Sequence, residues 1–420
     1  MADARLRRDV VWNLVPVALL AGVGLGSNVA IFAWWGSEGL AVFNLVTIAF
    51  FALAVVGACG LQFAVLRAVA EDPDDRDRVA SVVVGALVPN VVLAALVMLA
   101  FLALRGPFSA LQHSAAVGEG MLVAAPGLFC FSINKVLFSV VNGLRRMRAF
   151  AIYTSLRYAM IAVGVIVAKT TDASIGHIAM VWTIAEGTML VVLLGELVAT
   201  VSLRRAHDWR VWTRRHLEFG VRGVLATLAQ EINAKLDIWM LGAAGIPKPL
   251  VGVYAVAGAL SEGATQLSVV LPNHLNPLIA KDIAAGEPGL VAALARRTQR
   301  WFVPSFAAAC ALGALVFPFA LPWLMADASL HAASIPFAIL MAGLALGSPY
   351  LPFAQLLLMA NRPGWHTVLV LAVVAINFAG DLVMIPALGL TGAALATALA
   401  VVSSAMLVRL LGRRLVGAAI

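Results

Sequence analysis

Long apolar stretches separated by short polar connections dominate the pattern of this chain. A membrane-spanning helix needs about 20 apolar residues, and stretches of that kind recur here about every 35 residues. We therefore predict an all-α polytopic membrane protein of about twelve transmembrane helices. The predicted helices cover residues 11–33, 41–66, 80–104, 118–142, 149–169, 176–202, 217–243, 250–278, 301–325, 332–359, 366–386 and 389–411.

The composition supports a membrane protein and excludes several other classes. Of the 420 residues, 62% are hydrophobic and only 12% are charged, whereas soluble domains contain roughly 25% charged residues. A soluble enzyme, a disordered chain and a coiled coil are thereby excluded. The three cysteines all fall in predicted spans, and the seven histidines lack the spacing of metal ligands. No enzyme class emerges, and we expect neither a cofactor nor a metal site.

Lysine and arginine residues alternate between connections. They occupy the N-terminus, every second connection and the C-terminal tail, whereas the remaining connections contain only Arg105, Lys169 and Lys248. Because cytoplasmic loops carry the excess of positive charge, this alternation places both termini in the cytoplasm. It also explains the net charge of +8 through topology and contact with anionic membrane lipids, without a nucleic acid partner.

The basic connection at residues 203–216 is the longest and has six predicted spans on each side. Residues 40–43 open the second span as residues 251–254 open the eighth. Arg7 and Arg8 precede the first span as Arg214 and Arg215 precede the seventh. We therefore predict two six-helix lobes, 1–202 and 217–420, joined by the linker 203–216. Repeats of this kind enclose a central cavity.

Four cations lie inside the predicted spans: Lys135, Arg157, Arg222 and Lys235. Each costs roughly 2.5–3.5 kcal/mol at the centre of a helix on insertion scales, so we predict that they bind substrate. Lys135 and Arg157 lie on consecutive helices at matching depth in the cytoplasmic half. The alternative is that these cations extend toward the inner membrane interface without contacting a substrate.

Acidic residues inside the spans are candidates for ion coupling or for charge pairing. Glu231 and Lys235 are four residues apart and share a face of a continuous helix, so we predict that they pair, with Glu262 as the competing partner. Asp237 is rotated by about 120° from Glu231, so one helix face cannot present the whole set. The candidates are Glu231, Asp237, Glu262, Glu186 and Asp381.

Three segments resemble a known superfamily. They are LDIWMLG at residues 236–242, VGVYAVA at 251–257, and the ending that runs from Asn377 to IPALGLTGAALAT at 385–397. These segments are similar to those of polysaccharide flippases of the multidrug/oligosaccharidyl-lipid/polysaccharide exporter superfamily. The likeness extends to the layout of twelve spans, two lobes and a basic central connection.

The resemblance implies a two-lobed transporter without enzymatic activity in the bacterial inner membrane. By alternating access it would move an undecaprenyl-diphosphate-linked oligosaccharide to the outer leaflet for cell-surface polysaccharide biosynthesis, with a polymerase and glycosyltransferases as further partners. The anionic diphosphate would need cations in the inner half of the cavity. Three alternatives stay open: an ion-coupled multidrug exporter, a peptidoglycan-precursor flippase of the same superfamily, and a membrane scaffold that transports nothing.

Overall fold

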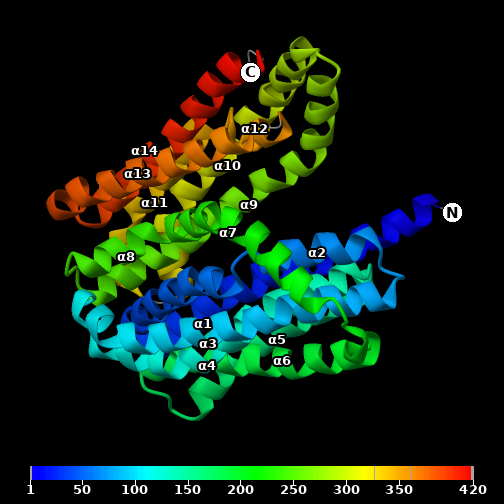
Figure 1. Ribbon diagram of the computed structural model, residues 1–420. Coiled ribbons are helices and arrows are strands. Elements are labelled where there is room, and N and C mark those ends of the chain that lie inside the picture. Colours follow the sequence, from blue (N-terminus) through cyan, green and yellow to red (C-terminus); the bar gives the residue numbers. More distant parts are fainter. Residues whose placement is uncertain (1, 326, 361, 418–420) are drawn as a thin grey trace. The chain divides into compact units, whose positions relative to one another are not determined.

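The computed structural model describes the backbone of residues 2–325, 327–360 and 362–417. Side chains are described in the same ranges except at residues 2–21, 25, 221–227, 230, 266–270, 273–274, 277–278, 280–281, 284, 288, 324–325 and 363. All regular structure in these ranges is helical (Figure 1), which confirms the predicted all-α class. The chain divides into two compact units, Met1–Ile232 and Asn233–Ile420. The predicted lobes, with a linker at 203–216, place the division earlier and stay a prediction.

The predicted spans fall on helical segments, but the helix at the predicted span 301–325 begins at residue 288, and the predicted span 332–359 is divided among several helical segments. Among the described residues, nine helices are long and apolar enough to cross a membrane. The first predicted span and most of the second lie in one element, which turns at Gly36 with φ 72° and ψ −176°, a conformation that glycine adopts without steric cost. The second span continues into the next helix after a break at Cys59 and Gly60. The seventh is interrupted at Lys235, whose φ of −131° and ψ of 13° separate two helices.

Unit 1 is a bundle in which one helix, α4, contacts most of the others. Glycines on α4 allow this close packing: a Cβ atom at Gly127 would lie 2.7 Å from the backbone nitrogen of Thr183 on α6, and one at Gly120 would lie 2.7 Å from Val46 on α1. The elements of this unit are α1 (Ala2–Ala58), α2 (Leu61–Glu71), α3 (Arg76–Leu111), α4 (Ala115–Gly143), α5 (Met147–Thr170), η1 (Gly176–Ala179), α6 (Met180–Thr200), η2 (Leu203–Arg205) and most of α7 (Trp209–Ala234).

Unit 2 is built around α14, which packs against α13 and α11, and the short helix α8 contacts α13, α9 and α14. Close contacts again need small residues, because a Cβ atom at Gly380 of α13 would lie 2.9 Å from that of Ala396 on α14. The elements are α8 (Leu236–Ala243), α9 (Lys248–Ala284), α10 (Pro288–Met325), η3 (Ala328–Ala333), α11 (Ser334–Gly347), η4 (Leu351–Phe353), α12 (Leu356–Met359), α13 (Pro363–Leu388), α14 (Leu390–Leu411) and η5 (Gly412–Val416).

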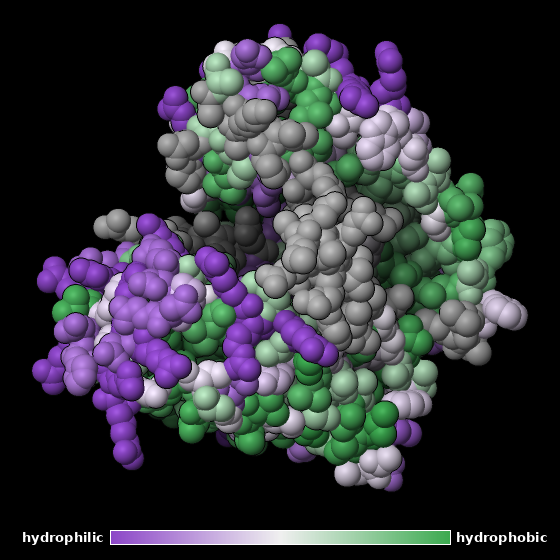
Figure 2. Space-filling model, turned by 90° about the vertical axis from the view of Figure 1, so that its right-hand side faces the viewer, coloured by the Kyte–Doolittle hydropathy of each residue, from purple (hydrophilic) through white to green (hydrophobic). Residues whose placement is uncertain are grey.

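The surface has the distribution expected of a multi-pass membrane protein. Large apolar side chains are exposed on the helices of both units, for example Val191 on α6 (73%) and Trp323 on α10 (83%). Figure 2 shows hydrophobic residues along its lower edge and hydrophilic residues gathered at its left. The polar connection between α2 and α3 in unit 1 is closed by an ion pair between Arg78 and Glu71 at 2.6 Å.

Candidate functional site

Three helices of unit 1 bring a cation, a carboxylate and an amide together. Arg157 on α5 donates from Nε to Oε1 of Glu186 on α6 at 2.6 Å. Asn134 on α4 donates from Nδ2 to Oε2 of Glu186 and to its backbone oxygen, both at 2.9 Å. Glu186 is fully buried. A carboxylate in such a place must be compensated by an opposite charge and by hydrogen bonds, and Arg157 and Asn134 supply both.

A second cation shares the same aromatic ring. The Cζ atom of Arg157 lies 4.5 Å from the centroid of Phe131, and the Nζ atom of Lys135 lies 5.1 Å from it. Phe131 precedes Lys135 by one turn of α4, and its ring is held by Phe50 and Phe51 at centroid distances of 5.5 and 5.3 Å. The negative face of an aromatic ring attracts cations, so Phe131 is a fixed platform that holds two positive charges close together.

We call these five residues, Phe131, Asn134, Lys135, Arg157 and Glu186, the arginine cluster. The matching depth of Lys135 and Arg157 in the sequence led us to expect them together, and the structure places both on one ring. Glu186 pairs with Arg157. The side chain of Arg222 lies outside the described residues. Phe131 and Asn134 were not predicted from the sequence, although the spacing of Phe131 and Lys135 by one helical turn would have indicated a shared face.

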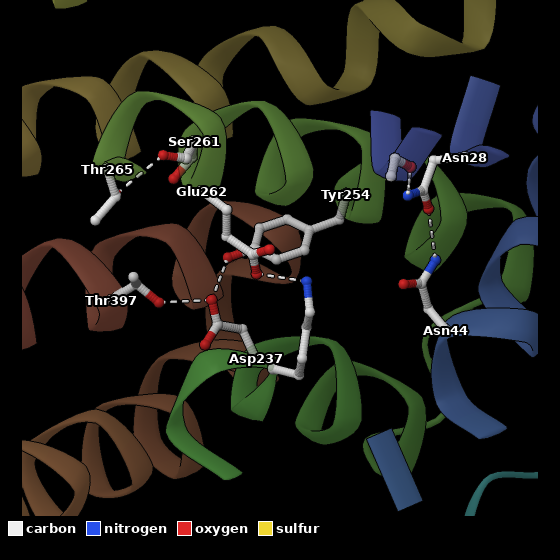
Figure 3. Close-up of polar contacts among 10 residues, drawn as sticks. Asn28, Asn44, Asp237, Tyr254, Ser261, Glu262, Thr265 and Thr397 are labelled. Carbon is white, nitrogen blue, oxygen red and sulfur yellow. Dashed lines mark hydrogen bonds and ion pairs between the residues drawn. The ribbon is translucent and has the colours of Figure 1, made fainter. Parts of the chain in front are cut away.

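A second set of polar groups surrounds Asp237 in unit 2 (Figure 3). Its Oδ2 atom accepts hydrogen bonds from the hydroxyl groups of Tyr254 on α9, at 2.7 Å, and Thr397 on α14, at 2.6 Å. Its Oδ1 atom accepts a longer bond, 3.4 Å, from Nδ2 of Asn377 on α13. Asp237 lies in the first turn of α8, so the interruption of the helix at Lys235 positions this carboxylate among three other helices.

Asp381 lies one turn after Asn377 on α13 and is fully buried. Within the part of the chain that the structure describes, neither of its carboxylate oxygens has a hydrogen-bond partner, and the same holds for Oδ1 of Asn377. Buried polar atoms without partners are rare in proteins and indicate a missing ion, water or proton. We call Asp237, Tyr254, Asn377, Asp381 and Thr397 the aspartate cluster.

The predicted pair of Glu231 and Lys235 is corrected by the structure. Lys235 forms its ion pair with Glu262 of α9, the competing partner that the sequence also offered. The side chains are partly exposed, 27% for Lys235 and 46% for Glu262. The physical reason is the helix break: residues four apart share a face only where the helix is continuous, and the backbone leaves the helical conformation at Lys235.

The sequence candidates thus separate into three groups. Lys135, Arg157 and Glu186 meet in unit 1. Asp237 and Asp381 belong to one cluster in unit 2, where Lys235 and Glu262 form a separate ion pair. Among the described residues, no group of three or more His, Cys, Asp or Glu side chains could hold a metal ion. The aspartate cluster contains two carboxylates together with amide and hydroxyl oxygens. Such oxygen atoms suit a hard cation and not zinc.

No family model and no curated protein matches the sequence. Solved structures match it closely in fold. A lipid II flippase, MurJ, in an inward closed conformation aligns with a TM-score of 0.76 at 13% identity, covering 96% of this chain and 87% of MurJ. An inward-facing multidrug resistance MATE family transporter of the MOP superfamily gives 0.75 at 15% identity, covering 97% and 98%.

The bent form of the Vibrio cholerae MATE transporter VcmN gives a TM-score of 0.59 at 14% identity, covering 97% of this chain and 95% of that one. These matches extend over nearly the whole chain and over both units. They agree, at the level of the fold, with the resemblance that the segments around Asp237 and Thr397 indicated. The chain shares the all-helical fold of the lipid II flippase MurJ and of MATE transporters.

Proposed function

We propose that this protein is an inner-membrane flippase that moves an anionic, polyprenyl-diphosphate-linked glycan from the cytoplasmic to the outer leaflet. Glycosyltransferases that build the glycan on its lipid would supply the substrate, and a polymerase would consume it. Support comes from the fold, since MurJ is described as a lipid II flippase. Further support comes from the arginine cluster, which carries two cations inside a membrane unit.

The observation that carries the proposal is the placement of two cations on the Phe131 ring. Glu186 engages Arg157 through Nε, and Lys135 contributes an ammonium group 5.1 Å from the same centroid. A guanidinium group has five N–H donors in a planar fork, and an ammonium group has three. Together they offer several charge-assisted hydrogen bonds to a diphosphate, whose two negative charges need such partners once it leaves water.

A multidrug exporter is the second candidate, because MATE transporters share the fold to a similar degree. A site with two positive charges on one ring would repel any drug that carries a positive charge. The arginine cluster therefore favours an anionic substrate.

The test is a translocation assay with purified protein in lipid vesicles, with a fluorescent lipid-linked oligosaccharide as substrate and a cationic dye as the competing one. We expect the oligosaccharide to cross, and the double variant Lys135→Ala, Arg157→Ala to abolish crossing. Arg146→Ala is the matched control, because it also removes an arginine that pairs with a glutamate of α6, Glu196. Unchanged translocation by a folded double variant, or transport of the dye alone, would overturn the proposal.

We further propose that the aspartate cluster couples transport to a monovalent cation. Two neighbouring carboxylates, one of them fully buried, are costly unless a cation or a proton compensates them, and Asp381 has no partner for either oxygen among the described residues. Asp237, Asn377, Asp381 and Thr397 would hold the ion through oxygen atoms. When bound, the ion would offset one of the two negative charges of the carboxylates.

Thermal unfolding in NaCl, KCl and choline chloride at constant ionic strength tests this assignment. A metal cation that binds only the folded state raises Tm in proportion to the logarithm of its concentration. We expect one of the two metal salts to stabilise the protein relative to choline, and Asp381→Asn to remove that difference. Glu262→Gln, which removes a neighbouring carboxylate outside the cluster, serves as the control and should keep it. Equal Tm values in all three salts, with a pH-dependent Tm instead, would assign the site to a proton.

A further inference from the structure

The arginine cluster has an excess of one positive charge in its buried part. Lys135 and Arg157 contribute two charges and Glu186 removes one. The titratable groups that act on Glu186 come from the two helices packed against α6: Cys130 and Lys135 of α4, and Arg157 and Tyr158 of α5. In η1, which also contacts α6, His177 is engaged with Ser174. Glu231 also acts on Lys135, but its side chain is exposed, so it does not count toward the charge of the buried part.

A diphosphate diester carries two negative charges, one more than this excess. Binding it beside Glu186 would leave the buried group with one uncompensated negative charge. Such a charge is expensive in a low-dielectric environment, and proteins avoid the cost by neutralising a titratable group. Glu186 is the group in question, because it is the fully buried carboxylate of the cluster. One proton on Glu186 restores the balance, since the two cations then face the two charges of the ligand.

A second observation favours Glu186 as the acceptor of that proton. Asn134 donates from Nδ2 to Glu186, yet its Oδ1 atom is buried and has no hydrogen-bond partner among the described residues. An ionised carboxylate can only accept hydrogen bonds, whereas a protonated one also donates. Rotation of the Asn134 amide would bring its oxygen to Glu186, where it would accept the new O–H in place of the bonds that Nδ2 now donates. The site thus contains an acceptor that receives no hydrogen bond while Glu186 is ionised.

We propose that binding of a diphosphate-linked lipid at Lys135 and Arg157 adds one proton to Glu186, so that substrate and proton occupy unit 1 together. The proton comes from water on the side to which the site is open and forms an O–H bond with a carboxylate oxygen of Glu186. No bond of the substrate breaks, and Lys135 and Arg157 keep their charges. This inference rests on the proposed function, and it makes the loaded state of the cluster electrically neutral.

The experiment measures binding of a short polyprenyl-diphosphate-linked sugar to the detergent-solubilised full chain by titration calorimetry between pH 6 and 9. Both charges of this diester are constant over that range. If binding takes up one proton, Kd increases by up to about tenfold for each unit by which the pH rises. Titrations in two buffers of different ionisation enthalpy count the protons directly. We expect close to one proton for the unmodified protein at the acid end of this range, and none for Glu186→Gln, whose Kd should not vary with pH.

Further variants identify the acceptor. Gln can still accept the hydrogen bond from Arg157, so Glu186→Gln should fold. Tyr158→Phe and Glu231→Gln should each keep the proton count, and its loss in either of them would assign the proton elsewhere and overturn the inference. Binding by the unmodified protein without proton uptake would refute this inference alone and leave the proposed function standing. Absence of binding at every pH would refute the proposed function and this inference with it.

Discussion

At the scale of single residues, Arg157 is not equivalent to a lysine. Its guanidinium group donates to Glu186 and lies over Phe131 at the same time, which a planar fork allows and a compact ammonium does not. We expect Arg157→Lys to keep part of the translocation activity, with a loss of roughly 10- to 100-fold, because one hydrogen bond to a charged group is worth about 1.5–3 kcal/mol. Initial rates of flipping in vesicles measure this. Activity equal to that of the unmodified protein would show that charge alone matters.

The pair of Lys235 and Glu262 is best tested by a double-mutant cycle. Because both side chains are partly exposed, we expect a coupling free energy of at most about 1 kcal/mol. Lys235→Ala and Glu262→Gln should therefore be non-additive in thermal unfolding, and the double variant should be more stable than the sum of the single effects predicts. The matched cycle of Lys235→Ala with Glu231→Gln should be additive. The reverse result would restore the pair that the sequence predicted.

His216 lies at the start of α7, outside the candidate spans, and is almost fully buried. Burial lowers the pKa of His216 below its usual value of 6.5, although a hydrogen bond with the backbone oxygen of Val82 opposes this. The folded state therefore keeps the imidazole neutral while the unfolded chain takes up a proton below about pH 6.5. Stability should fall as the pH drops from 6.5 toward 5.

The measurement is Tm as a function of pH for the unmodified protein and for His216→Gln, whose amide can replace the hydrogen bond to Val82. We expect the variant to lose part of the decline on the acid side. His207→Gln is the control, because His207 is exposed, and its curve should follow that of the unmodified protein. If the curve for His216→Gln is identical to those of the unmodified protein and of His207→Gln, the buried imidazole contributes nothing to acid sensitivity.

At the scale of elements, the break between α1 and α2 makes an unusually close contact with α7. Cys59 and Gly60 have φ values of 46° and 68°, and a Cβ atom at Gly220 of α7 would lie 2.0 Å from the carbonyl oxygen of Cys59. A backbone atom cannot move aside as a side chain does. We expect Gly220→Ala to destabilise the protein by about 1–3 kcal/mol, the usual cost of overpacking.

The comparison for this substitution is Gly195→Ala on α6, where a new Cβ atom would meet nothing within 4 Å. Alanine favours a helix over glycine by up to about 1 kcal/mol, so this control should be neutral or slightly stabilising in thermal unfolding. Equal effects of the two substitutions would mean that the contact between Gly220 and Cys59 does not form in solution.

The hydrophobic pattern predicted where the helices lie but not where they break. Apolar length alone identifies a span, and each predicted span matches a helical segment. The turns at Gly36 and Cys59–Gly60 and the break at Lys235 depend on tertiary contacts and on local backbone conformation, which the pattern does not contain. The break at Lys235 explains the one pairing that the sequence assigned wrongly, because helical spacing assumes a continuous helix.

At the scale of the whole molecule, the sequence predicted many charged residues of the candidate sites. Apart from Lys135 and Arg157, it did not predict which of them come together. The cost of a charge in a membrane identified Arg157, Glu186, Asp237 and Asp381 from the sequence. Their partners lie on other helices, far along the chain, so only the fold could bring Asp237 to Thr397 or Arg157 to Glu186. Neutral residues such as Phe131 gave no signal, because an aromatic side chain in an apolar helix is typical of any core.

The topology of the chain in the membrane follows from the alternation of charge. Arginines concentrate in every second connection, and moving them across the membrane would be costly. We expect reporter fusions after Leu203 and after Ile420 to show a cytoplasmic location, and a fusion after His113, between α3 and α4, to show an external one. Alkaline phosphatase and a fluorescent protein, active on opposite sides, give independent readings. A cytoplasmic reading at His113, or an external one at Leu203, would contradict the charge rule for this chain and would invert the side from which the arginine cluster receives its substrate.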